Sequence, residues 1–201
     1  LDRDTVRRRG GLERTLGAFE AGRVQVLVGT QMVAKGHHFP NVTLTGVISA
    51  DALLGLPDFR AGERTFQLLT QVAGRAGRGE RPGRVVVQTY YPDHPAVVHA
   101  ARHDVEAFGA EELLYRQAFR YPPTVRMVLV RLEGVEEGAV RRAAEAAARA
   151  APSEGVRVRG PAPAPLERIR AAWRWQLLLT SPSREPLRAS LAAIEAAPLP
   201  R

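Results

Sequence analysis

Cysteine is absent from this 201-residue sequence, lysine occurs once, and aromatic residues make up only 6% of it. The lack of cysteine excludes disulfides and thiolate metal sites within these residues, and it is typical of proteins from reducing compartments. The longest apolar runs, 24–28 and 125–130, have the length of a strand and are far too short to cross a bilayer. No apolar segment follows the polar, basic start, so we expect no signal peptide. The first residue is Leu1 rather than Met, which predicts a piece of a longer protein.

Arginine is abundant where lysine is scarce, and the formal net charge is +8. Such a balance suits a phosphate-rich partner, because each neutralised phosphate releases a condensed counterion. An arginine-rich composition with well-solvated side chains is an equally good interpretation of the charge alone. The single lysine, Lys35, falls inside the strongest motif of the chain.

The first part of the chain alternates predicted helices and strands. Leu12, Leu16 and Phe19 repeat at helical spacing, and Gly22 is placed to end that helix. A buried strand over 24–28 is expected next, ending at Gly29 and Thr30. The further expected elements are strands over 44–48 and 84–88, a helix over 63–73, a helix from Pro95 through Phe108, and a helical stretch that ends by Tyr121. This alternation predicts an α/β fold with a parallel sheet covered by helices.

A second domain is expected after Pro122 and Pro123, so we divide the chain into residues 1–121 and 122–201. Its predicted strands cover 125–132, 156–158 and 173–180, the last two separated by a proline-rich segment at 161–165. One helix has Val140, Ala143, Ala144 and Ala147 as its buried stripe, and a final helix has Leu187, Leu191 and Ile194. The order β-α-β-β-α predicts a small α+β domain that lacks one closing strand.

The strongest motif is GTQMVAKGHHFPNV at residues 29–42. A strand that ends in Gly29 and Thr30 leads into a loop rich in backbone amides. Ligands bind at the carboxyl ends of strands in open α/β sheets, where a hydroxyl and free amides can hold a phosphate. The pattern resembles motif V of superfamily 2 helicases, in which Lys35-Gly36 and Phe39-Pro40 match a basic-glycine pair and a hydrophobic-proline pair. His38 stands where many of these enzymes have an acidic residue.

The second motif is QVAGRAGR, from Gln71 to Arg78. It follows a predicted helix and places Arg75 and Arg78 three residues apart. Planar guanidinium groups suit the charge that spreads over a transferring γ-phosphoryl group. The pattern resembles motif VI, Q-x-x-G-R-x-G-R, of the same superfamily. The two motifs together, in this order, are a stronger signal than either alone.

The sequence around the two motifs narrows the resemblance to one family within this superfamily. Residues 35–44, 50–78 and 85–95 resemble the PriA family of replication-restart DNA helicases at nearly every position, including the segment DFRA-x-ER at 58–64. The resemblance begins at 1–5 and continues through GPAP at 160–163 and WRWQ at 173–176, so it covers almost the whole chain. The Walker motifs and the zinc-binding cysteines of the family lie upstream of the matched segments.

The resemblance implies a fold and a set of roles. Residues 1–121 would form the second RecA-like helicase lobe, and 122–201 the α+β C-terminal domain. It implies that ATP with Mg²⁺ binds between this lobe and another, and that zinc belongs only to the upstream region. The implied catalytic residues are Arg75 and Arg78. The implied ATP-binding residues are Gln71, Gly74, Arg75 and Arg78, the DNA-binding residues are Gly29, Thr30, Gln31, Lys35, Gly36 and His37, and Arg174 and Gln176 are partner contacts.

The implied function is that of an ATP-dependent 3′-to-5′ DNA helicase that recognises stalled or branched replication forks and starts primosome assembly. Its expected partners are single-stranded and branched DNA, single-stranded-DNA-binding protein, and primosome and helicase-loading proteins, in the cytoplasm at the nucleoid and without a membrane. This fragment alone is expected to be inactive as an ATPase. Two alternatives stay open: another superfamily 2 DNA translocase, and a non-catalytic primosome scaffold with a decayed ATPase.

Some of these residues also have plainer interpretations. Lys35 could be an exposed loop charge, and His37 could pack within its loop. His99 and His103 have a spacing that can hold a metal, but a surface helix explains it as well, and no metal site is expected. Trp173 and Trp175 alternate on a strand, so they share one face, while Arg174 and Gln176 share the other.

Overall fold

The computed structural model describes residues 11–30, 39, 41–74, 82–152 and 154–198. The chain divides into two compact units, Leu1–Glu112 and Leu113–Arg201, which we describe separately. This division falls inside one helix, α6 (Val105–Phe119). The sequence places the boundary slightly later, after Tyr121.

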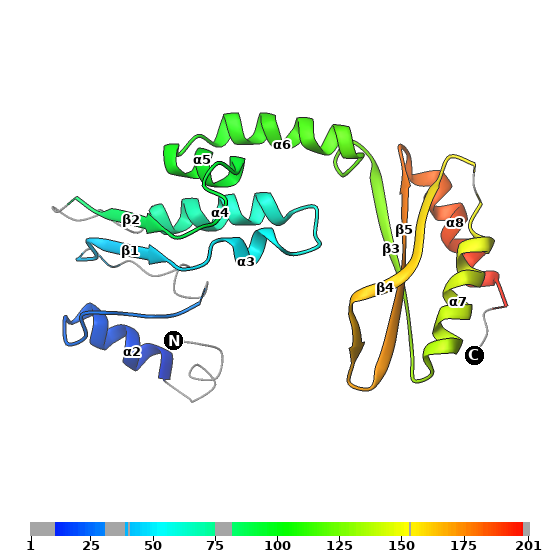
Figure 1. Cartoon of the computed structure of the whole chain (residues 1–201), viewed down its shortest axis with the longest axis horizontal. Helices are drawn as coiled ribbons and strands as arrows, with labels where there is room; N and C mark the ends of the chain where they lie inside the picture. Colours follow the sequence, from blue (N-terminus) through cyan, green and yellow to red (C-terminus); the bar gives the residue numbers. More distant parts are fainter. Residues whose placement is uncertain (1–10, 31–38, 40, 75–81, 153, 199–201) are drawn as a thin grey trace. The chain divides into compact units, whose positions relative to one another are not determined.

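Unit 1 contains a two-stranded parallel sheet. Strand β1 (Leu44–Val47) pairs with β2 (Arg84–Val87) in the register Leu44↔Arg84 to Val47↔Val87. Between them in sequence come α3 (Asp51–Leu54) and α4 (Ala61–Ala73), and α5 (Pro95–Arg102) precedes α6. Figure 1 shows α4 running alongside the two strands. The expected parallel pairing of these strands is confirmed.

The core of unit 1 lies between the sheet, α4 and the α5–α6 pair. Its buried residues are Ala50, Phe66, Leu69, Ala96, Ala100 and Phe108. The Phe66 and Phe108 rings stack with centroids 4.1 Å apart and planes 5° from parallel. Val47 and Val87, at the ends of the two strands, pack against this cluster. The helical face predicted from Phe66 and Leu69 is therefore the buried one.

Helix α2 (Gly11–Glu20) ends as its sequence predicts. Gly22 has φ +70°, the left-handed conformation that glycine adopts at little cost. The Arg23 amide donates to the Ala18 carbonyl at 2.9 Å, and the Gly22 amide donates to the Phe19 carbonyl at 3.0 Å. These two bonds satisfy carbonyls of the last turn in a Schellman motif.

The buried strand expected over 24–28 is wrong. This segment forms no strand with any described residue, and the Val26 and Val28 side chains are 73% and 74% exposed. Alternating apolar residues favour a strand only where a neighbouring strand pairs with them and another layer covers them. Neither is supplied by the described part of this chain.

The single helix expected from Pro95 through Phe108 is also wrong, because it is two helices. His103 adopts the left-handed conformation with φ 54°, and the Asp104 amide donates to the His99 carbonyl at 3.0 Å, which closes α5. The Asp104 carboxylate then accepts from the Ala107 amide at 2.9 Å and caps α6. The start of α5 is confirmed, with Pro95 at its first position and His94 as its N-cap.

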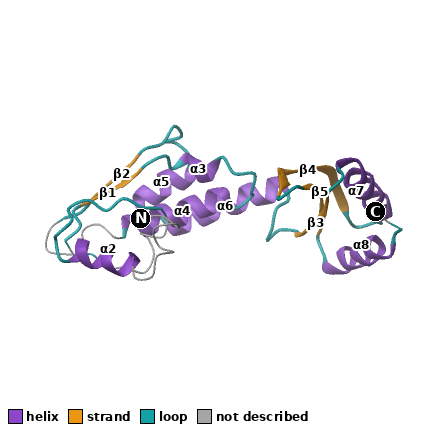
Figure 2. Ribbon diagram, turned by 90° about the horizontal axis from the view of Figure 1, so that it is seen from below, coloured by secondary structure: helices purple, strands orange, loops and turns teal. Residues whose placement is uncertain are grey.

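Unit 2 is a three-stranded antiparallel sheet with two helices. Its elements are β3 (Arg126–Gly134), α7 (Glu137–Ala150), β4 (Arg157–Ile169), β5 (Ala172–Ser181) and α8 (Arg184–Ala196). The strand order is β3-β5-β4, so β5 is central. Figure 2 shows α7 and α8 on the same side of the sheet. The predicted order β-α-β-β-α is confirmed.

The core of unit 2 lies between the sheet and these helices. Leu177 and Leu179 on β5 are completely buried, and Val128 and Val130 of β3 pack against them. The stripe predicted for α7, Val140, Ala143, Ala144 and Ala147, is buried throughout. The face of the sheet turned away from α7 and α8 holds Leu129, Arg131, Arg174, Gln176 and Arg159.

The short strand expected over 156–158 is wrong in extent, because β4 continues through the proline-rich segment to Ile169. Proline cannot donate a ladder hydrogen bond, so it is tolerated on an edge strand but not on a central one. β4 is an edge strand, and its pairing with β5 shifts register between Arg159 and Ala162 and again between Pro163 and Arg168. The strand order therefore explains why the prolines do not end the strand.

Candidate nucleotide and DNA site

Only part of the predicted site lies in the described residues. Gly29 and Thr30 form the end of the exposed segment that follows α2. Gln31, Lys35, Gly36 and His37 lie outside the described residues, as do Arg75 and Arg78. Gln71 and Gly74 are described and lie at the carboxyl end of α4. The described residues therefore do not test whether the two motifs lie close together in space.

Helix α4 determines how Gln71 is presented. Phe66, Leu69 and Val72 are buried against the core, so Gln71 falls on the opposite, exposed face. The Gly74 amide donates to the Thr70 carbonyl at 3.0 Å, so this amide closes the helix. The last turn of α4 is thus held by the core, and the Gln71 amide group faces solvent.

The DFRA-x-ER segment forms a cluster of ion pairs and hydrogen bonds at the start of α4. The Asp58 carboxylate accepts from the Arg60 amide at 3.0 Å and pairs with Arg64 Nη1 at 2.8 Å. Burial opposes the charged carboxylate, but the bonds from Arg60 and the nearby charges of Arg60 and Arg64 outweigh it, so the pKa of Asp58 is lowered. This segment, which carried much of the resemblance, fixes the helix that leads to Gln71.

A second carboxylate joins the carboxyl ends of β1 and β2. Asp51 accepts a short hydrogen bond from the Thr89 hydroxyl and another from the Tyr90 amide at 3.0 Å. The Thr89 hydroxyl lowers the pKa of Asp51 most, and the Tyr90 amide contributes. Sequence reasoning missed this residue, although a carboxylate three residues after a predicted strand is a signal that points to a sheet edge. Asp51 thus connects the chain after β1 to the chain after β2, at the carboxyl edge of the sheet where α/β folds bind ligands.

The histidines of α5 have structural contacts. His99 Nε2 lies 2.8 Å from Glu111 Oε2, and His103 caps the helix. Among the described residues, no group of three or more His, Asp or Glu side chains is placed to hold a metal ion.

Arg174 and Gln176 lie on the face of the unit 2 sheet that is turned away from α7 and α8. Arg174 Nε donates to Glu133 Oε1 at 2.8 Å, and the Arg174 side chain is only 11% exposed. Trp173 and Trp175 lie on the other face, both half-buried, and the Arg168 guanidinium lies 5.2 Å from the centre of the Trp173 ring. Any partner that binds Arg174 would compete with Glu133 for it.

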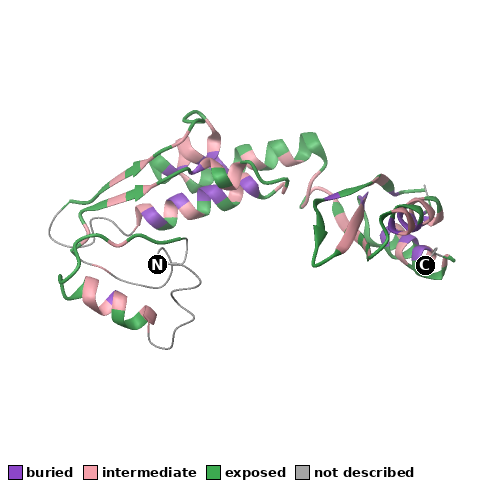
Figure 3. Ribbon diagram, turned by 60° about the horizontal axis from the view of Figure 1, so that its bottom comes forward, coloured by how far each residue is buried: buried purple, intermediate pink, exposed green. Residues whose placement is uncertain are grey.

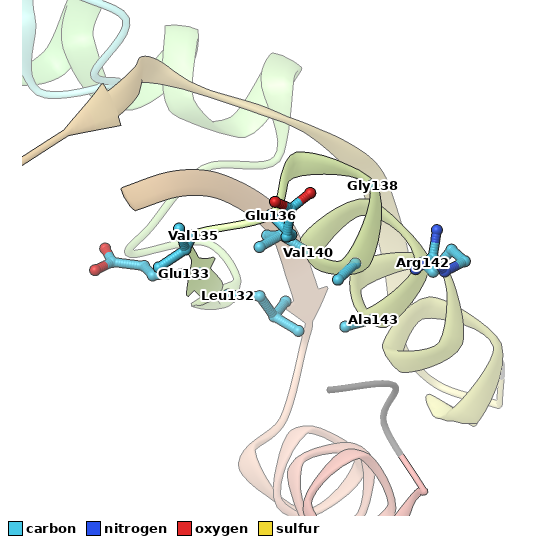
Figure 4. A pocket seen from close by; sticks show the side chains of 10 residues that line it. Leu132, Glu133, Val135, Glu136, Gly138, Val140, Arg142 and Ala143 are labelled. Atoms are coloured by element: carbon cyan, nitrogen blue, oxygen red, sulfur yellow. The ribbon is translucent and has the colours of Figure 1, made fainter. Parts of the chain in front are cut away.

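The described residues of unit 2 line at least two hollows. A basic groove of about 280 Å³ lies between β3 and α8, with apolar Val128, Leu187 and Leu191 beside Arg126, Arg184 and Arg188. A larger hollow of about 670 Å³ lies where β3 leads into α7. Figure 4 shows Glu133 and Arg142 on opposite sides of this larger hollow, so its lining presents charges of both signs. The basic groove is the better candidate for an anionic partner.

Comparison with known proteins decides the family. Residues 117–201 match the family model described as the primosomal protein N C-terminal domain. The chain is 44% identical over 186 residues to the replication restart protein PriA of Synechocystis sp., a match that covers 91% of this chain and 22% of that protein. It is 43% identical over 197 residues to PriA of Bacillus subtilis, covering 96% and 24% of the two chains. With PriA of Haemophilus influenzae it shares 41% identity over 202 residues, covering 99% and 28%.

The chain belongs to the PriA family. It spans about a quarter of the length of the PriA relatives that it matches. The PriA C-terminal domain match includes all of unit 2 apart from its first four residues, 113–116. No helix among the described residues is long and apolar enough to cross a membrane.

Proposed function

We propose that this chain is part of an ATP-dependent 3′-to-5′ DNA helicase that acts at stalled or branched replication forks and starts primosome assembly. The observation that carries the proposal is the similarity to proteins named replication restart protein PriA over 91–99% of the chain. Unit 1 is then the second RecA-like lobe. The parallel pairing of β1 and β2, with α3 and α4 between them in sequence, supports this assignment.

The nucleotide side of the proposal rests on motif VI. ATP with Mg²⁺ binds against Gln71, Gly74, Arg75 and Arg78, with Arg75 and Arg78 stabilising the charge on the transferring phosphoryl group. The packing of α4 supports this role, because the Phe66–Phe108 stack holds the helix that presents Gln71 against the core. ATP supplies the phosphoryl group and the free energy of translocation, and the protein side chains orient it.

The DNA side rests on motif V. Gly29, Thr30, Gln31, Lys35, Gly36 and His37 contact the phosphate backbone without reading base sequence. Arg174 and Gln176, and the basic groove of Arg126, Arg184 and Arg188, are surfaces for acidic partners such as single-stranded-DNA-binding protein and other primosome components. In this proposal the protein works in the cytoplasm at the nucleoid.

The test compares Lys35→Ala with Arg149→Ala in this chain. Lys35→Ala should weaken binding to single-stranded DNA of any sequence and reduce the slope of log K against log salt by roughly 0.7. Arg149 is an exposed arginine on α7 and serves as the matched control, for which we expect the parent slope. Superimposable titrations of the parent and Lys35→Ala would remove Lys35 from the site.

The catalytic assignment needs a full-length PriA protein that carries this sequence. There Arg78→Ala should reduce ATP turnover by about 10³-fold or more with little loss of DNA affinity, because an arginine finger acts on charge that develops in the transition state. Near-normal turnover with weakened DNA binding would assign Arg78 to the DNA contact instead.

A further inference from the structure

Three aromatic rings gather at the end of α6, in unit 2. Tyr115 and Phe119 lie one turn apart on the helix with ring centroids 4.6 Å apart. Tyr121, just past the helix, lies 6.5 Å from Tyr115 and 6.4 Å from Phe119, with its plane 29° and 23° from theirs. Tyr115 is 49% and Phe119 53% exposed, and Figure 3 shows the end of α6 as exposed. Half-exposed rings in a cluster are a binding surface more often than scattered single ones.

The turn after α6 holds this cluster rigidly. The Tyr121 amide donates to the Arg116 carbonyl at 2.8 Å, and Arg120 takes the left-handed conformation with φ 55°. The Thr124 hydroxyl donates to the Tyr121 carbonyl at 2.7 Å, and Arg116 Nη1 donates to the Pro122 carbonyl at 3.2 Å. These bonds hold the backbone of Tyr121 beside the helix, which lowers the conformational entropy lost when a flat ligand binds.

The residues that follow the first ring are basic, and the nearest carboxylates on the helix are Glu111 and Glu112, one turn before Tyr115. Residues 113–132 contain no aspartate or glutamate, but they contain Arg116, Arg120, Arg126 and Arg131. Arg116 and Arg120 lie on the same turn of chain as the rings. Aromatic planes 23° to 41° apart beside cations match a single strand of nucleic acid, whose bases stack on the exposed rings while its phosphates meet the arginines. An apolar protein surface would cover the rings but would bring no anionic group to this basic segment.

We propose that Tyr115, Phe119 and Tyr121 form a base-stacking surface for single-stranded DNA. This inference rests on the proposed function, since it gives a DNA-directed protein a second contact that is separate from Lys35. The rings hold bases, whereas Lys35 holds phosphate. Stacking is tolerant of sequence, because every base presents a π face.

The experiment measures binding of the 201-residue chain to a fluorescent thymidine oligonucleotide and to an abasic strand of the same length. Phe119→Ala should weaken oligonucleotide binding by about tenfold. The same variant should leave binding to the abasic strand unchanged, because the phosphates remain. Phe119→Tyr should keep parent affinity because it keeps the ring, and Leu114→Ala, which removes an apolar residue 66% exposed on the same helix, should have no effect.

Several outcomes overturn the proposal. Equal losses for Phe119→Ala and Leu114→Ala, or abasic binding as tight as that of the thymidine strand, mean that the rings stack no bases. If Phe119→Ala alters the circular dichroism spectrum, Phe119→Leu replaces it, and parent affinity in that variant counts against stacking. A loss of self-association in Phe119→Ala with unchanged DNA affinity would make the surface a protein interface.

The failure of this inference is distinguishable from failure of the proposed function. Salt-dependent DNA binding that responds to Lys35→Ala but not to Phe119→Ala defeats only the stacking surface. No binding of single-stranded DNA by the parent chain defeats both.

Discussion

The two units cover their strands to very different degrees. In unit 2, Leu177 and Leu179 of the central strand are fully buried beneath α7 and α8. In unit 1, one face of the β1–β2 sheet packs on the core, but Leu44 and Val86 on the other face are 62% and 48% exposed. An apolar pattern indicates that a residue is suited to burial, but the pattern does not identify what covers it. Unit 2 supplies its own cover, whereas the described part of unit 1 covers one face of its sheet.

The largest expected effect tests this contrast directly. Leu177→Ala should destabilise unit 2 by about 2–5 kcal/mol, because it empties a fully buried site between sheet and helices. Val26→Ala, at a position 73% exposed, should change the free energy of unfolding by less than about 0.5 kcal/mol. Urea denaturation followed by circular dichroism measures both. A loss at Val26 as large as that at Leu177 would show that residues 24–28 are buried in solution.

A second, smaller effect distinguishes the two units by how their stability depends on pH, because all five histidines lie in unit 1. Burial is the main reason that the pKa of His94 is lowered from 6.5, and the nearby Glu112 and Glu111 partly oppose it. His94 Nδ1 accepts the Ala96 amide at 3.1 Å, which requires an unprotonated nitrogen. The stability that His94 contributes is therefore fully present above pH 6.5 and is lost as the pH falls through the lowered pKa of the folded state.

The variants His94→Ala and His94→Asn sharpen that prediction. His94→Ala should cost unit 1 about 1 kcal/mol at a pH of about 7.5, because the N-cap acceptor is lost. His94→Asn keeps an acceptor without a titrating ring, so it should retain stability and lose the pH dependence below pH 6.5 that His94 causes. Thermal denaturation across this range is the measurement. The same pH dependence in the parent and in His94→Asn would assign it to other groups.

The smallest expected effect lies in unit 2. The Ser190 hydroxyl on α8 is completely buried and has no hydrogen-bond partner among the described residues. Ser190→Ala removes this unsatisfied group at nearly constant volume, so it should be neutral or stabilise the unit by about 1 kcal/mol. Differential scanning calorimetry gives the change, with Arg188→Ala at an exposed position of the same helix as the control. A clear destabilisation by Ser190→Ala would mean that the hydroxyl has a partner in solution.

Local signals predicted many of the elements, and tertiary context decided the rest. Gly22 predicted the end of α2, Pro95 the start of α5, and the spacing of Val140 and Ala144 the buried face of α7. The failures came where context overrides pattern. The break at His103 depends on its left-handed backbone, and the length of β4 depends on its edge position, neither of which the local sequence specifies.

The candidate site was predictable as motifs but not as contacts. Phe66 and Leu69 predict which face of α4 is buried. Gln71 lies on the opposite face, so its exposure could be expected. The roles of Lys35, Arg75 and Arg78 stay predictions, because these residues lie outside the described part of the chain. The Asp51–Thr89 bond joins residues far apart in sequence, so it becomes visible only once β1 and β2 are paired.

The prolines of β4 have a consequence for solubility. Pro161, Pro163 and Pro165 lie on the edge strand β4, where its pairing with β5 is irregular. Because proline has no N–H group, three positions along this edge strand cannot donate a ladder hydrogen bond. A strand from another molecule cannot complete a ladder along that rim, which protects the sheet from edge-to-edge aggregation at high concentration.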